Sequence, residues 1–310
     1  MSMGIGDQNL HMLTGGILGQ CGHPVEVSPS LFKSYFAGGG TQTCPAENCG
    51  RAIDLWEAVK ACFLGAGAAF SLLTPLGGMS VWTTIQIEPG EFFELDLETL
   101  GVASDDIVRG ITLTGFSHMD VPPVTPALIF GNQPRLPVHL PHQLTFFGVN
   151  KAGGQPVTQV GNFNVHVQFL PKQETPYRQL LLGGVIALGD GDKRGGVIDA
   201  HTAADIALDS FTTQLVQQLT PYQEPRLGFL EKVGMLMVAR SQSGLPPVPE
   251  PLLKTLGVLN QRRNWAVHPS RVTRELTDDV AADCLTASLF LIHLVELSTG
   301  AENSDSTVVT

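Results

Sequence analysis

The apolar residues of this chain change period near residue 176, and that change limits the folds available to it. Before it, apolar and polar residues alternate in short runs; after it, apolar residues recur every three or four positions. The alternating runs are 81–87, 93–97, 107–113, 144–149 and 163–169. Alternation sends successive side chains to opposite faces, so each run predicts a strand. Short strands separated by Pro and Gly turns predict an antiparallel β-sandwich or small barrel.

The helical part begins at Pro176. The predicted helices are 177–188, 197–219, 227–240, 251–267 and 278–297. Their apolar residues form a stripe on one face, and Gly, Pro and Asp mark the connections. Because these connections are short, the sequence predicts that the helices pack together as a bundle.

The two patterns divide the 310 residues into predicted domains. We expect a Cys/His segment with a short helix at 55–64 over residues 1–65, a β-sandwich-like domain over 66–175 and a helical domain over 176–300. Residues 301–310 have no apolar period and are expected to be a disordered tail.

The first domain contains four residues suited to a metal site. Cys21-Gly-His23 precedes the turn Cys44-Pro-Ala-Glu-Asn-Cys49-Gly50. Thiolates and an imidazole are the ligands of structural zinc, so Cys21, His23, Cys44 and Cys49 predict one tetrahedral site. The turn resembles a zinc-ribbon knuckle, with four residues between the cysteines instead of two. Zinc would stabilise a segment with few large apolar residues of its own. The alternative is reduced cysteines in loops.

The five cysteines also bear on location. Their odd number and uneven spacing are not typical of a secreted disulfide framework. Cys62 and Cys284 lie in apolar runs and are predicted to be buried. No apolar stretch reaches the length needed to span a membrane, and the first twenty residues lack a basic segment. We therefore expect a soluble, cytoplasmic protein with no membrane contact.

The net charge of −11 excludes a protein that holds nucleic acid by bulk electrostatics. The charge is uneven along the chain. Residues 1–175 carry seven Lys and Arg against fourteen Asp and Glu, whereas residues 176–300 carry eleven against thirteen. Four arginines of the helical part cluster at 262, 263, 271 and 274. Any RNA contact is therefore expected to be local and sensitive to salt.

Arg263, Asn264 and His268 form the most distinctive pattern in that cluster. Asn264 and His268 are four residues apart and share a helix face. Pro269 disfavours helical geometry at the residue before it, so the helix should end near Val267 and free His268 to turn toward Arg263. A guanidinium grips phosphoryl oxygens and an imidazole moves protons near neutral pH. The alternative is a helix end whose cations complement the helix dipole.

This stretch resembles the Arg-x4-6-His motif of the HEPN superfamily, including the polar residue after the arginine. The order of the helices is also similar to that family, with Ala203-Ala204-Asp205 in the longer second helix. The resemblance covers residues 176–298. It implies an all-helical domain that forms homodimers, and in many members a metal-independent endoribonuclease whose cleft lies between two copies.

The resemblance also implies residue roles. His268 would transfer protons, Arg263 would stabilise transition-state charge, and Asn264 would orient His268 or the phosphate. Asp205 would orient the cation, unless it is simply a solvated or structural acid. Arg262 and Arg271 would bind RNA, and no catalytic metal is needed because the neighbouring 2′-hydroxyl attacks.

Two other functions stay open. The helical domain can be a catalytically silent dimerisation scaffold, as in some relatives, or the β-domain can sense a ligand or protein partner and control the nuclease. HEPN nucleases commonly act in toxin and antiphage systems, which fits a regulatory front half. His139 and His142, in a Pro-rich loop, and the nearby His118 and His166 can be surface histidines or a ligand site.

Overall fold

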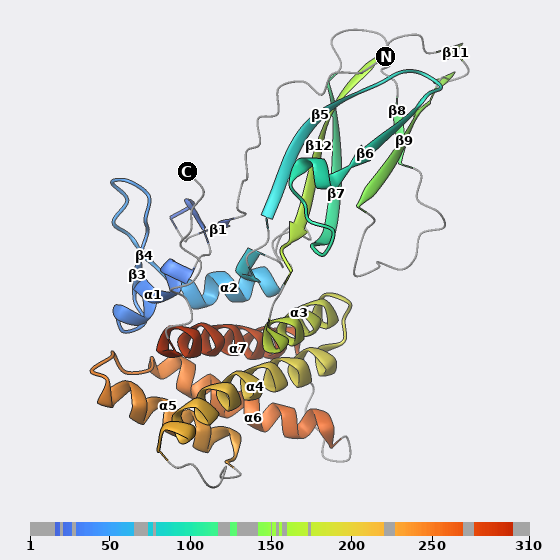
Figure 1. Ribbon diagram of the computed structural model, residues 1–310. Coiled ribbons are helices and arrows are strands. Elements are labelled where there is room, and N and C mark those ends of the chain that lie inside the picture. Colours follow the sequence, from blue (N-terminus) through green and yellow to red (C-terminus); the bar gives the residue numbers. More distant parts are fainter. Residues whose placement is uncertain are drawn as a thin grey trace. The chain divides into compact units, whose positions relative to one another are not determined.

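The computed structural model describes residues 16–18, 21–26, 29–64, 74–76, 79–116, 125–128, 142–149, 151–152, 155–156, 160–172, 175–219, 227–268 and 276–299. These residues form two compact units (Figure 1). The β unit contains those between Leu76 and Lys172. The helical unit contains those between Gly16 and Pro75 together with those after Lys172, so the β unit is inserted in its sequence.

The β unit is built on two three-stranded antiparallel sheets. One has the order β5-β12-β7 and the other β6-β9-β8. The strands are β5 (Met79–Ile87), β6 (Phe92–Asp96), β7 (Ile107–Phe116), β8 (Thr125–Leu128), β9 (Gln143–Val149) and β12 (Gly161–Leu170). A short hairpin of β10 (Lys151–Ala152) and β11 (Gln155–Pro156) accompanies them. All five predicted strands are therefore confirmed, and their pairing is antiparallel as expected.

Both sheets contribute to one apolar core. Ile85 of β5, Leu95 of β6, Phe146 of β9 and Val165 of β12 are all buried in it. The alternation seen in the sequence has its cause here: in β5 the residues at 81, 83, 85 and 87 are buried and those between them are exposed. A shift of one residue in register would exchange these two sets, so the core fixes the register.

The connection from β5 to β6 passes over β9 at Gly148. Gly90, which has φ of 78°, donates its N–H to the carbonyl of Gly148, and the N–H of Gly148 donates to the carbonyl of Glu91 at 2.9 Å. A Cβ atom at position 148 would overlap the carbonyl oxygen of Glu88. The crossing of the two backbones therefore requires glycine at 148.

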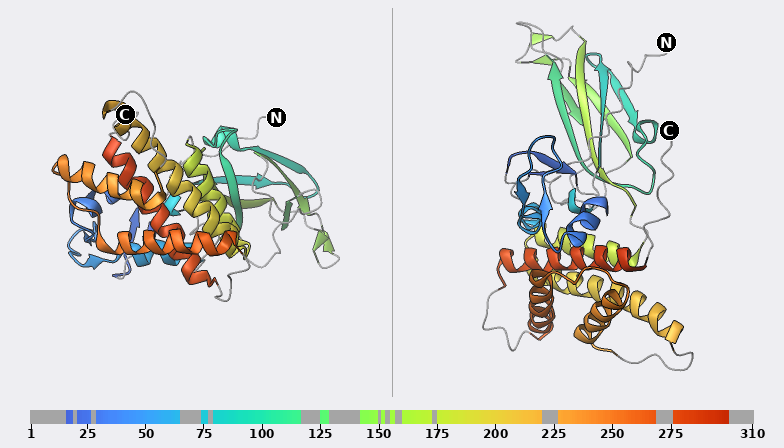
Figure 2. Two further views of the ribbon diagram at one scale, coloured as in Figure 1. Left: turned by 90° about the horizontal axis from the view of Figure 1, so that it is seen from below. Right: turned by 90° about the vertical axis from the view of Figure 1, so that its left-hand side faces the viewer.

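The helical unit is arranged around α7 (Asp278–Thr299). In Figure 2 the first two helices lie on one side of α7, and α4, α5 and α6 lie on the other. The remaining helices are α1 (Pro29–Ala37), α2 (Leu55–Phe63), α3 (Pro176–Gly189), α4 (Lys193–Leu219), α5 (Phe229–Gln242) and α6 (Glu250–Val267). Two small hairpins, β1 (Gly16–Leu18) with β2 (Pro24–Glu26) and β3 (Gln42–Thr43) with β4 (Ala52–Ile53), complete the unit.

The six predicted helices are confirmed to within four residues at each end. The helix at 55–63 begins as the sequence indicates, with Oδ1 of Asp54 accepting the N–H of Glu57 at 3.1 Å. Helix α1 was not predicted, although Ser28 followed by Pro29 is a helix-start signal in the sequence. Across the described residues the chain has seven helices and small antiparallel sheets, a mixed α and β fold.

Helices α1 and α2 pack on α7 through aromatic rings. Phe290 of α7 lies 5.1 Å, centroid to centroid, from each of Phe32, Tyr35 and Trp56. Phe32 is fully buried and Tyr35 is nearly so. The expectation that the first segment has few large apolar residues of its own is therefore wrong: α1 supplies aromatic core to the helical unit.

Ion pairs fasten the outer helices to α7. Lys60 of α2, whose side chain is 10% exposed, lies 2.8 Å from Asp279 and 3.0 Å from Asp283. Arg178 of α3 binds the carboxylate of Glu296 through Nε at 2.8 Å and through Nη2. Both cations are partly withdrawn from water, so each pair fixes a helix position more than an exposed pair would.

The expectation that no apolar stretch is long enough to span a membrane is wrong for helix α7, which by length and composition is apolar enough to cross one. Its most apolar window is 83% buried within the protein. Packing against helices on both sides therefore accounts for its composition without a membrane.

Substituting Gly148→Ala tests the crossing of β9. The added methyl group must displace backbone at Glu88, so we expect the β unit to lose about 1–3 kcal/mol of unfolding free energy. Urea unfolding followed by fluorescence, with β-sheet circular dichroism, measures the loss. Gly234→Ala in α5 is the control: a Cβ there meets nothing within 4 Å, and the exchange should stabilise the helix by about 0.5–1 kcal/mol. Equal stability of Gly148→Ala and wild type would contradict the required close approach.

Candidate functional site

The Arg263, Asn264 and His268 group lies at the C-terminal end of α6. The helix ends at Val267, and His268 has φ of −112° and ψ of 81°, so its backbone leaves helical geometry where the sequence predicts. Its N–H still donates to the carbonyl of Asn264 at 3.2 Å. The imidazole is exposed, Arg263 is half-buried, and Nη1 of Arg263 donates to Oδ1 of Asn264 at 3.3 Å. A cation, an amide and an accessible imidazole therefore share one helix terminus.

Arg262 lies beside this group but turns to a different neighbour. Its guanidinium carbon stacks over the ring of Trp265, 3.9 Å from the centroid. Its Nε is buried and has no hydrogen-bond partner within the described part of the chain. Stacking fixes the guanidinium plane, and the unsatisfied N–H remains able to bind an acceptor.

Asp205 of α4 does not pair with an arginine of the motif among the interactions found. It accepts a hydrogen bond from Nζ of Lys232 of α5 at 2.7 Å, and Asp209 lies 2.6 Å from the same nitrogen. Burial opposes the charge of Lys232, but the bonds to the two carboxylates outweigh it and raise its pKa. The acid predicted to orient a cation thus binds a buried lysine between α4 and α5.

His201 of α4, one turn before Asp205, was not predicted as a site residue but contacts the helix that carries the motif. Its Nε2 lies 3.3 Å from Oδ1 of Asn260, one turn before Arg263 on α6. The imidazole is 7% exposed and packs on the ring of Phe229. Burial lowers the pKa of His201, with a further lowering from the charge of Arg263. The i, i+4 spacing of His201 and Asp205, which places both on one face of α4, was the available sequence signal.

The four predicted metal ligands come together in the helical unit. One ligand atom from each of Cys21, His23, Cys44 and Cys49 lies within 4.8 Å of all the others. Sγ of Cys44 is 3.6 Å from Nδ1 of His23. Bonds of about 2.3 Å to sulfur and about 2.05 Å to nitrogen at a tetrahedral ion give the same separation, about 3.6 Å. The group can therefore hold a metal ion, and its ligands and spacing are compatible with structural zinc.

Local backbone geometry positions the cysteines. The N–H of Cys44 donates to the carbonyl of Arg51 at 2.8 Å, which closes the loop between β3 and β4. Within the loop, Asn48 and Gly50 have φ of 62° and 59°, and the N–H of Cys49 donates to the carbonyl of Ala46 at 3.1 Å. This left-handed turn brings Cys49 back toward Cys44 despite four intervening residues.

The thiols of the group differ in proton affinity. The backbone N–H of His23 lowers the pKa of Cys21 to about 7, whereas burial raises the pKa of Cys44. The thiols of the other two cysteines stay protonated at neutral pH, because burial raises the pKa of Cys62 to about 11 and that of Cys284 to about 12. Cys284 is buried, as predicted, and Cys62 is half-buried.

Several predicted residues fall outside the described part of the chain. These are Arg271, Arg274, His118, His139 and the tail at 301–310. His142 and His166 are described and half-buried, and His166 stacks on Trp82 with ring centroids 4.1 Å apart.

Comparison with known proteins identifies no relative. No family model, curated protein or solved structure matches this chain. The function therefore has to be argued from the residues themselves.

The pKa of His201 makes a testable contribution to stability. Because its folded pKa lies below the unfolded value of about 6.5, the stabilisation is complete above that pH and is lost as pH falls toward the folded pKa. For each unit by which the folded pKa lies below the unfolded pKa, wild type loses about 1.4 kcal/mol of unfolding free energy once His201 is protonated in both the folded and the unfolded state. His201→Gln keeps a donor for Asn260 but does not titrate, so it should lose less stability than wild type between pH 7.5 and 5. Urea unfolding at both pH values measures this. His166 and His293, whose pKa values burial also lowers, contribute to the slope that remains, and equal losses would contradict a buried neutral His201.

Proposed function

We propose that this protein is a metal-independent endoribonuclease of the HEPN type. One observation carries the proposal: Arg263, Asn264 and an exposed His268 lie together where α6 ends. The end of α6 at Val267 and the hydrogen bond between Arg263 and Asn264 support the proposal. The same proposal interprets the helical unit as a HEPN-like bundle and the two facing sheets of the β unit as a sandwich.

The proposed reaction needs no metal at the phosphate. The 2′-hydroxyl attacks the neighbouring phosphorus, a base takes the hydroxyl proton, and the bond from phosphorus to the 5′-oxygen breaks as an acid protonates that oxygen. His268 carries out proton transfer in this reaction, and Arg263 neutralises charge on the pentacoordinate phosphorane. Asn264, bonded to Arg263, holds the guanidinium in place. The products are a 2′,3′-cyclic phosphate and a 5′-hydroxyl.

Arg262 has a supporting role in this proposal. Its guanidinium is held by stacking on Trp265, and it is proposed to contact a phosphate oxygen of the RNA through nitrogens other than the buried Nε. Arg271 joins it as an expected RNA contact on sequence grounds alone.

Burial argues for a homodimer. Cleavage uses both a base and an acid, but His201 is too buried to reach an RNA phosphate. His268 is the exposed imidazole beside Arg263. A second copy brings its own His268, so pairing of the helical units would place two such groups in one cleft.

The alternative is a catalytically silent scaffold whose β unit senses a ligand or protein partner. The net charge of −11 favours it, because a nuclease without bulk positive charge binds RNA weakly. If the protein is a nuclease, the same charge implies that it cuts a small set of RNAs and that its activity is regulated. A toxin or antiphage effector that stays inactive until triggered would have these properties.

RNA cleavage separates these proposals. We expect wild type to cut end-labelled single-stranded or transfer RNA without added metal and to leave cyclic phosphate ends. His268→Ala and Arg263→Ala should each slow cleavage about 100-fold or more. Lys254→Ala is the control, since this exposed lysine of the same helix pairs only with Glu250 among the contacts found. RNA with 2′-O-methyl groups should resist cleavage. A dimer that binds RNA but leaves it intact would favour the silent scaffold.

We also propose that the Cys/His group holds one structural zinc ion. Three sulfurs and one nitrogen leave no open position for substrate, so the ion would act on stability alone. It would join Cys21 and His23 to the loop after β3 and so hold this segment against α1 and α2.

Metal analysis tests this proposal. We expect one zinc per chain in wild type and less than about one tenth of that in Cys49→Ser, because a site with three protein ligands binds far more weakly. Removal of zinc by a chelator should lower the melting temperature of the helical unit. Cys62→Ser removes a thiol outside the group and should retain full zinc. Full zinc in Cys49→Ser would contradict the assigned ligand set.

A further inference from the structure

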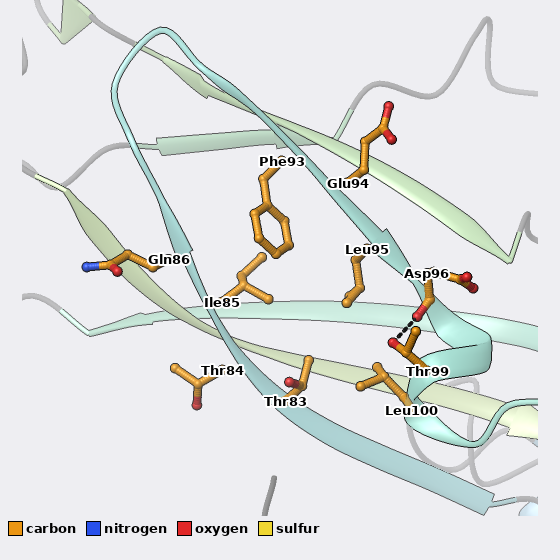
Figure 3. Close-up of a pocket in the computed structure, with 10 residues that line it drawn as sticks. All are labelled: Thr83, Thr84, Ile85, Gln86, Phe93, Glu94, Leu95, Asp96, Thr99 and Leu100. Atoms are coloured by element: carbon orange, nitrogen blue, oxygen red, sulfur yellow. Dashed lines mark hydrogen bonds between the residues drawn. The ribbon is translucent and has the colours of Figure 1, made fainter. Parts of the chain in front are cut away.

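A pocket of about 180 Å³ lies between strands β5 and β6 of the β unit (Figure 3). Figure 3 shows Ile85 and Phe93 approaching each other from the two strands, with Thr83, Leu95 and Leu100 nearby. Gln86, Thr84 and Glu94 also line the pocket, but their side chains turn away from Ile85 and Phe93. The interior is therefore mainly apolar, and the backbones of two strands form its mouth.

Both strands are at the edges of their sheets. In the orders β5-β12-β7 and β6-β9-β8, β5 and β6 each pair with one strand only among the described residues. An edge strand keeps a row of N–H and C=O groups that another strand can bind. Proteins usually guard such an edge with Lys or Pro, but the nine residues Met79–Ile87 contain no proline and no charged residue. Among the described residues, no second strand pairs with β5 from Val81 to Ile87, so this part of its edge is available to another strand.

An acidic rim surrounds this edge. Five carboxylates are exposed between the end of β5 and the turn after β6: Glu88, Glu91, Glu94, Asp96 and Glu98. No Lys or Arg occurs in the sequence between Lys60 and Arg109. Carboxylates so concentrated repel a phosphate backbone and attract lysine or arginine.

The pocket size limits what can enter it. Sites for drug-sized ligands measure about 300–1,000 Å³, so about 180 Å³ suits a single aliphatic or aromatic side chain. An added strand alternates its side chains, which places one in the pocket while its neighbours meet the rim.

From these observations we infer that the edge of β5 and β6 binds an extended, basic peptide segment of a partner protein. The segment adds as a strand, inserts one apolar side chain between Ile85 and Phe93, and sets its Lys or Arg residues against the acidic rim. This interaction is independent of the proposed nuclease and does not require it.

Binding of a fluorescein-labelled peptide to the full chain tests the inference. The probe is a ten-residue peptide of alternating Lys and Val with Leu at its centre. We expect saturable one-to-one binding by fluorescence polarisation that weakens with salt. The same peptide with alternate backbone nitrogens methylated keeps its charge and apolar groups but cannot pair as a strand, and it should bind at least tenfold more weakly.

Two pairs of variants locate the site. Thr83→Leu fills the pocket and should weaken binding about tenfold, whereas Thr84→Leu, on the outward face of the same strand, should not. The exposed rim variant Glu94→Lys should weaken binding severalfold at low salt, and Asp190→Lys, an exposed acid of the helical unit, should leave it unchanged. If Thr83→Leu does not fold, the comparison of Glu94→Lys with Asp190→Lys and the binding of the methylated peptide still test the inference. Equal binding of the methylated peptide, equal effects of Glu94→Lys and Asp190→Lys, or no saturable binding would overturn the inference.

Discussion

The packing of Phe290 determines how the helical unit is assembled. This ring of α7 contacts Phe32, Tyr35 and Trp56, which all come from the first 60 residues of the sequence. Burying aromatic rings stabilises such a contact by several kcal/mol, more than an exposed ion pair would. The Cys/His group and the α6 motif are consequently held on one body. A change in the packing of α7 would reach both sites through helices that contact it directly.

The sequence predicted the local structure and the chemistry better than the tertiary partners. The four cluster ligands were predicted from ligand type and spacing, and they converge to within 4.8 Å. The end of α6 was predicted from Pro269, because proline acts on the residue before it whatever the tertiary fold. Strand periods were equally clear, since each sheet has one buried face.

What the sequence could not predict depends on contacts between distant segments. The packing of α1 on α7 joins residues more than 250 positions apart, which no local period records. The partner of Asp205 was also unpredictable: on sequence alone an arginine of the motif and Lys232 were equally available, and only the packing of α4 on α5 decides. His201 was overlooked for the same reason, because its role depends on Asn260 of another helix.

The insertion of the β unit has a consequence for synthesis on the ribosome. Phe32 and Tyr35 emerge early, but the ring of Phe290 that covers them is translated more than 250 residues later. At about 5–20 residues per second, roughly 10–50 s pass before these aromatics can be buried. The described residues of the β unit lie in one stretch of the sequence, Leu76–Lys172, which is translated completely during that interval. The nascent N-terminal segment therefore lacks its main aromatic partner until the last helix leaves the exit tunnel, and exposed apolar surface of this kind is prone to aggregation.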